Sequence, residues 1–322
     1  METTTKKQII EALQEYMKEH SINQSEIAHK CNVPAEYLSI MLQPNSKFEY
    51  SAGQNKKGFI SVKYFNQIAS FIGFSIRKEY WQVQPTPQIS SMLANLQEAK
   101  DNHITLTLIG QTGSGKTFAS ELFKKRNPKD VFMIKAGSSD TLNDLIDKLV
   151  DETKVQTTGQ SKSSKLRAIS QKFESLKNLG YKPALIVDES EYLNVFALCA
   201  FKELYDHVHQ FASIIFVGTH QFVNKMDMLL RRNKVGIKQF HRRIKFGLRL
   251  LPAIDKDYSV FFQDLEDREL KEFLLRNCDN YGELHDVLEP SLREADRMGQ
   301  PLTLELVRKV INLPVGDMQW IA

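Results

Sequence analysis

Residues with the types and spacing needed for phosphate chemistry begin at Gly110. The segment 110–117 reads GQTGSGKT and matches the pattern G-x-x-x-x-G-K-[ST] at every fixed position. Glycines let the backbone turn tightly, so that N–H groups can point inward at a phosphate. The apolar run at 104–109 predicts a strand before this loop, and the pattern at about 116–125 predicts a helix after it. The predicted ATP-binding residues are Gly110, Gln111, Thr112, Gly113, Ser114, Gly115, Lys116, Thr117 and Phe118.

Two carboxylates follow a second apolar run, at 184–187. Asp188 and Thr117 are expected to hold Mg²⁺ through oxygen atoms, while Lys116 contacts the β- and γ-phosphates. Glu189 is expected to orient and deprotonate the attacking water. A carboxylate at this place favours hydrolysis of ATP over transfer of its phosphate to another molecule.

A polar residue also ends the strand expected at 213–218, where SIIFVG is followed by Thr219. The carboxyl ends of parallel strands meet at one edge of a sheet. Thr219 is therefore predicted to contact the γ-phosphate or the attacking water.

Residues 228–249 carry basic charge only. The basic side chains of this stretch are Arg231, Arg232, Lys234, Lys238, Arg242, Arg243, Lys245 and Arg249. One-signed charge indicates an anionic partner, either the ATP of a neighbouring subunit or the phosphates of DNA. A solvated basic face is the simpler alternative.

A second basic stretch, at 153–167, is polar and contains one glycine and no acidic residue. It is expected to be a loop before a helix and to contact DNA phosphates, largely without regard to base sequence. A solvated loop remains the alternative. The predicted DNA-binding residues are Lys154, Lys162, Lys165 and Arg167, with Ser138 in the loop after the strand at 131–135.

Composition limits the class of protein. The chain has 322 residues, 42% hydrophobic and 25% charged, which is the ordinary globular mixture and favours about two domains. Its formal net charge of +4 is compatible with a nucleic-acid partner without establishing one. Cys31, Cys199 and Cys278 are too far apart for a paired-cysteine site, so free thiols in the cytoplasm are expected. The longest apolar runs are too short to span a membrane.

Apolar runs alternate with helical patterns between 91 and 252, which predicts an α/β fold with a parallel sheet. Within residues 1–80, helical patterns lie at 6–42 and 61–74, and the polar segment 44–58 between them reads as a loop or wing. The proline-containing segment 81–90 reads as a linker. Helices alone are expected at 253–322. The predicted organisation is therefore a small all-α domain, a linker, an α/β core and a helical lid.

The loop, the ALIVDE strand, the polar strand end and the stretch QFHRRIKF together resemble an AAA+ ATPase core, with residues 253–322 as its lid. The resemblance implies ATP bound between subunits and an arginine finger, with Arg243 favoured and Arg242 close behind. Lids of this class often carry a phosphate-contacting arginine, but His285 stands at the best-aligned position here. A neutral histidine cannot supply the same constant charge, so slow hydrolysis, stimulated by DNA, is expected.

NQSEIAHKCNVPAEYLSIMLQ, at 23–43, resembles a repressor-like helix-turn-helix. Asn32 falls at the turn, where a left-handed backbone is needed. The expected recognition helix exposes no lysine or arginine, so DNA binding and protein docking remain equally open for this domain.

This order of domains resembles the transposon target-selection ATPases, the family of phage Mu transposition protein B. That resemblance implies assembly on duplex DNA as a helical filament or ring, with a transposase as partner. Two alternatives stay open. A helicase loader would prefer single-stranded DNA, and a nucleotide-gated transcription regulator would need residues 1–80 for DNA binding.

Overall fold

The fold was obtained as a computed structural model, which describes residues 3–20, 22–44, 46–51, 57–74, 80–157 and 161–312. The backbone forms two compact units, Met1–Glu79 and Tyr80–Ala322. The tail 313–322 of the predicted lid and residues 158–160 of the predicted DNA-contact loop lie outside the described residues.

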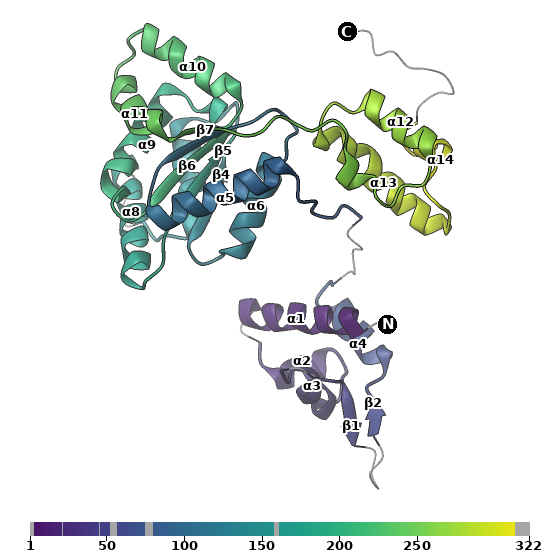
Figure 1. The fold of residues 1–322 in the computed structure, drawn as a ribbon. Helices are drawn as coiled ribbons and strands as arrows, with labels where there is room; N and C mark the ends of the chain where they lie inside the picture. The colour runs from purple at the N-terminus through teal and green to yellow at the C-terminus, as the bar shows by residue number, and fades with distance from the viewer. Residues whose placement is uncertain are drawn as a thin grey trace. The chain divides into compact units, whose positions relative to one another are not determined.

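The first unit consists mainly of short helices around one apolar cluster (Figure 1). Asn23 caps the second helix, since its Oδ1 accepts a hydrogen bond from Glu26 N at 2.9 Å. Asn32 has φ 51°, the left-handed backbone that the sequence predicts at the turn. The buried residues of the predicted helix pair are Ile27, Ala28, Cys31, Val33, Leu38 and Met41. The helices are α1 (Thr3–His20), α2 (Gln24–Lys30), α3 (Ala35–Met41) and α4 (Val62–Phe71).

This unit is not all-α as predicted, because it also contains an antiparallel hairpin of β1 (Glu49–Ser51) and β2 (Lys57–Phe59). Gly58 allows the two strands to pair closely, since a Cβ there would lie 2.6 Å from the Tyr50 ring. Each strand has only three residues, which is too short for an alternating pattern to stand out in the sequence.

The second unit contains a five-stranded parallel sheet in the order β4-β5-β6-β3-β7. The four apolar runs found in the sequence are confirmed as strands. The fifth strand, β7, was missed because its three residues are exposed and belong to the basic stretch. The strands are β3 (Leu106–Ile109), β4 (Val131–Lys135), β5 (Ala184–Asp188), β6 (Ser213–Gly218) and β7 (Leu248–Leu250).

Helices cover both faces of this sheet (Figure 1). Alternate residues of β5 point to opposite faces, so Leu185 joins the apolar cluster of one face and Ile186 that of the other. One face packs against α5 (Pro87–Asn102) and α6 (Lys116–Arg126). The other packs against α7 (Leu142–Thr153), α8 (Lys162–Asn178), α9 (Val195–Val208), α10 (His220–Arg231) and α11 (Ile237–Ile244).

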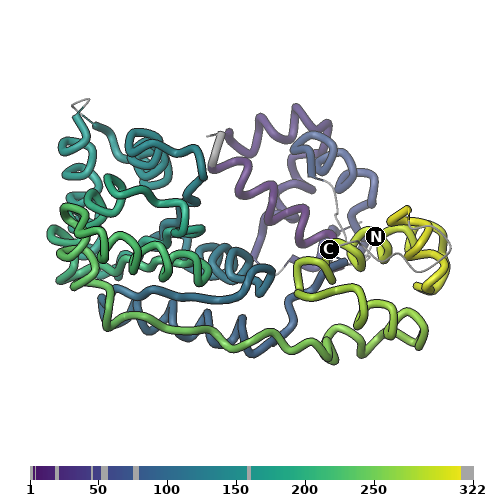
Figure 2. The backbone as a smooth tube through the Cα atoms, turned by 90° about the horizontal axis from the view of Figure 1, so that it is seen from above, coloured from purple at the N-terminus to yellow at the C-terminus, as the bar shows by residue number. Residues whose placement is uncertain are grey.

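Helix α5 begins at Pro87, inside the segment 81–90 that was predicted to be a linker. Thr86 caps the N-terminus of the helix, and Pro87 occupies its first turn, where a missing backbone N–H is tolerated. The segment before α5 runs beside the chain that leaves β7 (Figure 2). Gln88 joins the two, since its side-chain amide donates to Ala253 O and accepts from the Tyr281 hydroxyl at 2.9 Å.

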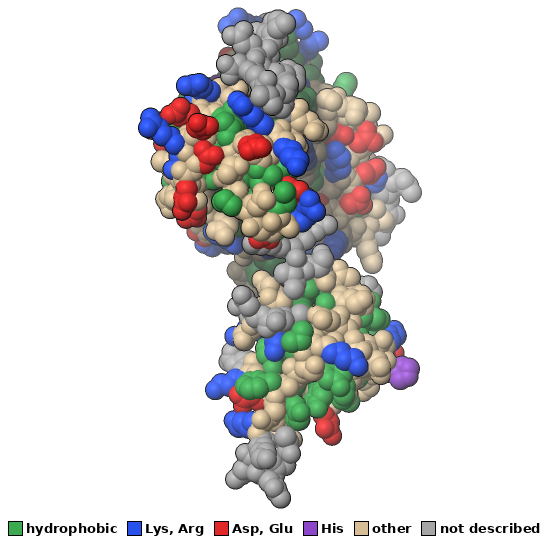
Figure 3. Space-filling model, turned by 90° about the vertical axis from the view of Figure 1, so that its right-hand side faces the viewer, with side chains coloured by type: hydrophobic (Ala, Val, Ile, Leu, Met, Phe, Trp, Pro, Cys, Tyr) green, Lys and Arg blue, Asp and Glu red, His purple; other side chains and the backbone are tan. Residues whose placement is uncertain are grey.

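The lid has its own apolar cluster, formed by helices after residue 253. Trp81 belongs to this cluster through its stacked contact with Phe261, at 4.8 Å between ring centroids. Acidic and basic side chains mix over the lid face seen in Figure 3. Ion pairs such as Arg293–Glu289 form within the lid. The face in view is therefore a poor candidate for binding an extended anion. Its helices are η3 (Ser259–Phe261), α12 (Arg268–Asn277), α13 (Tyr281–Met298) and α14 (Leu304–Val310).

Among the residues that the structure describes, no helix combines the length and the apolar character needed to cross a membrane.

Candidate active site

The predicted phosphate loop connects β3 to α6 at the carboxyl edge of the sheet (Figure 1). Gly113 and Gly115 have φ of 72° and 82°, a backbone conformation that residues with a Cβ adopt only with strain. The loop is tied to the neighbouring strand, because Gly110 N donates to Gly218 O at 3.1 Å. The tight turn of the loop leads directly into the N-terminus of α6, whose free backbone N–H groups can donate hydrogen bonds to an anion.

Lys116 lies at the start of α6 and folds back onto the loop. Its Nζ donates to Gly110 O at 3.1 Å and to Gln111 O at 2.6 Å. Burial lowers the pKa of Lys116, and the nearby carboxylates, Glu191 foremost, oppose that effect. A cation in a partly desolvated loop is well suited to bind phosphate.

The loop also holds a buried hydroxyl that has no protein partner. Ser114 is 2% exposed, and its Oγ makes no hydrogen bond with any residue that the structure describes. An unpaired buried hydroxyl is costly, and a phosphate oxygen would satisfy it. Gln111 and Thr112 are exposed at the loop tip, while Phe118 is half-buried in α6.

Thr117 and Asp188 meet across the sheet edge. The Thr117 hydroxyl donates to Asp188 Oδ2 at 2.6 Å, and Glu189 N donates to Asp188 Oδ1 at 2.9 Å. Burial raises the pKa of Asp188, which is 1% exposed. One hydroxyl and one carboxylate are the protein ligands that Mg²⁺ commonly takes when phosphates and water supply the rest. No cluster of three or more histidine, cysteine or acidic residues competes for a metal within the described part of the chain.

Glu189 lies just beyond β5 in a left-handed backbone conformation, with φ 52°. Its Oε1 pairs with Lys135 Nζ at 3.0 Å, and this pair raises the pKa of Lys135. Lys135 ends the neighbouring strand β4 and was not predicted from the sequence as part of the site. The strand register explains why Lys135 contacts Glu189, because Lys135 lies opposite Asp188, the residue before Glu189, in the parallel ladder.

Thr219 caps helix α10, as its Oγ1 accepts from Gln221 N at 3.3 Å. Its hydroxyl donates to Glu191 Oε1 at 3.0 Å. Glu191 was missed by the sequence analysis, although it is the third carboxylate within the short run DESE. A single turn of 3-10 helix, η1 (Ser190–Tyr192), carries it back to the strand end.

The lid reaches the loop through Asn280 and Gly282. Gly282 N donates to Gly113 O at 3.3 Å, and a Cβ on Gly113 would lie 2.1 Å from Asn280 Oδ1. Glycine at 113 is therefore needed for its space as well as for its φ. His285, the residue predicted to contact the phosphates, is placed beside Asp286 and at the edge of the Trp81 ring.

The two candidate arginine fingers on α11 differ. Arg243 is held within its own chain by Asp206 and lies over the Tyr205 ring, at 5.6 Å from its centroid. Arg242 is exposed and has no ion-pair or hydrogen-bond partner among the described residues.

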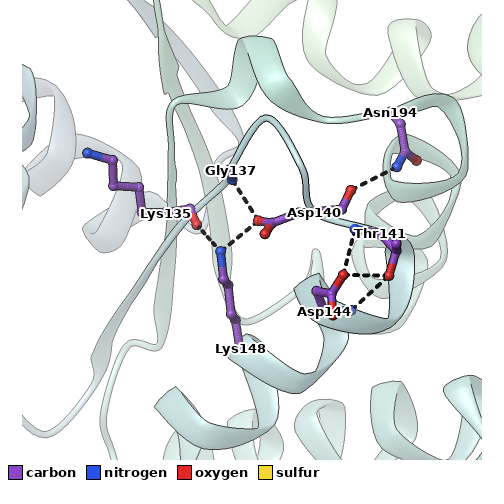
Figure 4. A network of polar contacts seen from close by, with 7 residues as sticks. All are labelled: Lys135, Gly137, Asp140, Thr141, Asp144, Lys148 and Asn194. Atoms are coloured by element: carbon purple, nitrogen blue, oxygen red, sulfur yellow. Dashed lines mark hydrogen bonds and ion pairs between the residues drawn. The ribbon is translucent and has the colours of Figure 1, made fainter.

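The loop after β4 presents Ser138 at an exposed position, and a polar network fixes the residues around it (Figure 4). Asp140 Oδ2 accepts from Gly137 N and from Lys148 Nζ, each at 2.6 Å. Asn194 Nδ2 donates to Asp140 O at 3.4 Å and so ties this loop to α9. The loop carries Ser138 on a fixed backbone.

The other predicted DNA contacts surround the start of α8. Lys154, Lys162 and Arg167 are exposed. Lys165 differs, because its Nζ pairs with Asp147 at 2.5 Å and its side chain is only 20% exposed.

Comparison with known proteins agrees with this geometry. Residues 100–226 match the family model described as "AAA domain", so this segment is an AAA domain. No curated protein matches the chain. The Orc1 protein of Aeropyrum pernix, solved in complex with DNA, is similar in structure, with 12% identity, a TM-score of 0.53 and coverage of 74% of this chain and 67% of that one. Cdc6p of Pyrobaculum aerophilum is similar at 16% identity and the same TM-score, over 76% and 71%. These likenesses establish the AAA+ P-loop fold.

Proposed function

We propose that this protein binds ATP with Mg²⁺ and hydrolyses it to ADP and phosphate. The observation that carries the proposal is the convergence of Lys116, Thr117, Asp188, Glu189 and Thr219 at the carboxyl ends of three adjacent strands. That set offers a cation for phosphate, two oxygen ligands for a metal, a base and a polar residue for the attacking water.

Each of these groups has one task in the reaction. Lys116 and the N–H groups of the loop bind the β- and γ-phosphates. Thr117 and Asp188 would hold Mg²⁺, and the ion would supply positive charge to the same phosphates. A water oxygen attacks the γ-phosphorus as the bond to the ADP oxygen breaks, and Glu189 takes the proton from that water.

We further propose that ATP joins neighbouring copies of this chain. The support is the basic surface at the end of α11, where an exposed arginine can reach the phosphates bound by the next subunit. A site completed by a second subunit makes hydrolysis depend on assembly. Hydrolysis would then loosen the assembly.

Duplex DNA is the proposed partner of this assembly. Lys154, Lys162 and Arg167 supply exposed positive charge around one helix end, and Ser138 lies on a fixed loop. The similar Orc1 protein was solved with DNA bound, which supports nucleic acid as a partner for this fold. Contacts of this kind bind backbone phosphates and are sensitive to salt.

The proposed cellular role is to deliver target DNA to a transposase. The proposed location of the protein is the cytoplasm. Its support is the resemblance of the domain order to the transposon target-selection ATPases. The first unit would bind DNA or dock a protein partner.

Electron microscopy in negative stain would test the proposal, using long duplex DNA with and without ATP. Wild-type protein, Lys116→Ala and Glu189→Gln would be compared, with Lys125→Ala as a matched control because Lys125 is exposed on the same helix. We expect ATP-dependent filaments or stacked rings on DNA, lost in Lys116→Ala, stabilised in Glu189→Gln and unchanged in Lys125→Ala.

Rings that ignore duplex DNA but bind single strands would contradict this role and favour a helicase loader. A deletion of residues 1–80 distinguishes the proposed role from the other alternative, a nucleotide-gated transcription regulator. Binding of duplex should survive that deletion if the core makes the contacts, whereas a transcription regulator would lose it.

A further inference from the structure

The direction of the Thr219 hydroxyl is fixed by its neighbours. A hydroxyl has one hydrogen to donate and two lone pairs that accept. The Thr219 hydrogen points to Glu191 Oε1 at 3.0 Å, and Gln221 N donates to the oxygen at 3.3 Å. One lone pair therefore remains for the active site, and no hydrogen.

Glu191 is held firmly enough to impose this direction. Its Oε2 accepts from Thr219 N at 3.4 Å, so both carboxylate oxygens face the same residue. Lys225 Nζ donates to the backbone oxygen of Glu191 at 2.8 Å. The carboxylate also packs on Gly218, where a Cβ would lie 2.6 Å from Oε2. Side chain and backbone are thus anchored separately.

The carboxylate of Glu191 also acts on the phosphate loop. Among the acidic groups that favour the charged form of Lys116, Glu191 has the largest effect, ahead of Asp188 and Glu189. Glu191 packs on Gly218, whose backbone oxygen accepts a hydrogen bond from Gly110 N of the loop at 3.1 Å, so the carboxylate lies beside the phosphate loop as well as beside Thr219. Its contact with Thr219 is not a remote surface pair.

We propose that Glu191 is a positioning residue that makes Thr219 a hydrogen-bond acceptor for the attacking water. The inference deepens the ATPase function proposed above and rests on it. Oxygens of the γ-phosphate carry no hydrogen, so an acceptor-only hydroxyl cannot bind them. Water carries two hydrogens. Glu189 accepts one and Thr219 accepts the other, which leaves a water lone pair directed at phosphorus.

Glu191→Gln tests this arrangement with little change in shape. A glutamine offers one acceptor and one donor. Its single oxygen can accept from Thr219 Oγ1 or from Thr219 N but not from both, so one of the two contacts that fix Thr219 is lost, and an amide N–H that faces Oγ1 would occupy a lone pair of the hydroxyl. Because small errors in geometry can slow a reaction by about 10²-fold, we expect kcat for ATP to fall by roughly 10- to 100-fold. Affinity for ATP should change less than kcat, because the hydrogen bonds of Lys116 go to Gly110 O and Gln111 O and not to Glu191.

Two Thr219 variants and a double variant make the test specific. Thr219→Ser keeps the hydroxyl and should keep most activity, whereas Thr219→Ala should fall as far as Glu191→Gln. If Glu191 acts through Thr219, the double variant Glu191→Gln/Thr219→Ala is no slower than Thr219→Ala alone. Glu203→Gln, at an exposed position on α9, serves as the matched control. Thermal unfolding and ATP affinity of every variant report whether the fold is kept.

The outcomes distinguish a failure of the proposed role of Glu191 from a failure of the proposed ATPase function. Full activity in Glu191→Gln, with activity lost in Glu189→Gln, would overturn the role of Glu191 and leave the ATPase intact. Multiplying losses in the double variant would also overturn it. Wild-type protein without ATP hydrolysis, with or without duplex DNA, would overturn the proposed function itself and this inference with it.

Discussion

Asp206 holds Arg243 by a hydrogen bond and a second ion-pair contact. Arg243 Nε lies 2.7 Å and Nη2 2.6 Å from Asp206 Oδ1, and Nη1 donates to Gln239 O at 2.7 Å. The side chain is 23% exposed and covers the Tyr205 ring. An arginine fixed in this way must break these contacts before it can reach the ATP of a neighbour. Arg242, the next residue, is exposed and carries no such bond within the described part of the chain.

We therefore predict that Arg242 is the finger and that Arg243 stabilises α11. Arg242→Ala should lower DNA-stimulated ATP hydrolysis by about 10³-fold, the scale of a lost arginine finger, with no change in unfolding temperature. Arg243→Ala should lower the unfolding temperature instead, as should Asp206→Ala. Steady-state hydrolysis and thermal unfolding measure the two effects.

A mixing experiment distinguishes a finger from a local effect. Lys116→Ala subunits keep Arg242, and Arg242→Ala subunits keep an intact phosphate loop. Mixed in equal amounts, the two inactive variants should regain part of the activity, because a shared site needs one group from each. No recovery in the mixture would contradict a finger at Arg242.

Lys135 is expected to restrain Glu189. The pair is 3.0 Å long, and its two side chains are 57% and 36% exposed, so it is worth at most about 1 kcal/mol. Lys135→Ala frees the carboxylate to meet the water. We predict that basal ATP hydrolysis rises by no more than about fivefold, the equivalent of that energy. Lys124→Ala is a matched control, because Lys124 pairs with Glu152 and lines the same pocket as Lys135 and Thr117. A fall in activity for Lys135→Ala alone would indicate that Lys135 contacts phosphate instead.

The four cations near α8 should not contribute equally to DNA binding. Lys162 is exposed, whereas Lys165 is paired with Asp147. Each phosphate contact that is lost reduces the slope of log affinity against log salt by about 0.9. We predict that change for Lys162→Ala and a smaller one for Lys165→Ala, measured by fluorescence anisotropy between about 50 and 200 mM salt. Asp147→Asn should raise affinity by releasing Lys165, and Lys172→Ala, farther along α8, should change nothing.

Parts of the candidate site that consist of one continuous segment could be predicted from the sequence. The phosphate loop and the strand before Asp188 are continuous segments whose spacing alone reveals them. The residues that contact these site residues could not be predicted, because they are brought together only by the tertiary fold. Lys135 meets Glu189 through the register of two strands, and Arg243 meets Asp206 between two helices. No spacing in one sequence encodes those distances.

Glu191 could be predicted only in part from the sequence. Its position three residues after Asp188 is visible in the sequence, but its contact with Thr219 requires the single turn η1. Strand β7 escaped prediction for a different reason. It is an exposed three-residue strand with a basic side chain, and burial pattern is the main signal for a strand.

His103 gives the molecule a predictable dependence on pH. It ends α5 with φ 55°, and its Nδ1 is buried without a partner among the described residues. Burial lowers the pKa of His103 below its usual 6.5, assisted by Lys182 and Lys100 and opposed by Asp101. Between the lowered value and 6.5 the unfolded chain binds more protons than the folded chain, so the free energy of unfolding falls as pH falls through this window.

His103→Asn should remove this dependence, because asparagine tolerates a left-handed backbone and does not titrate. Urea unfolding at about pH 5.5 and 7.5, on either side of the ordinary histidine pKa, measures the effect. The free energy of unfolding of wild-type protein, relative to His103→Asn, should be lower at the acid pH than at the higher one. The same difference at both values would show that His103 keeps an ordinary pKa in the folded chain, and that acid sensitivity arises elsewhere.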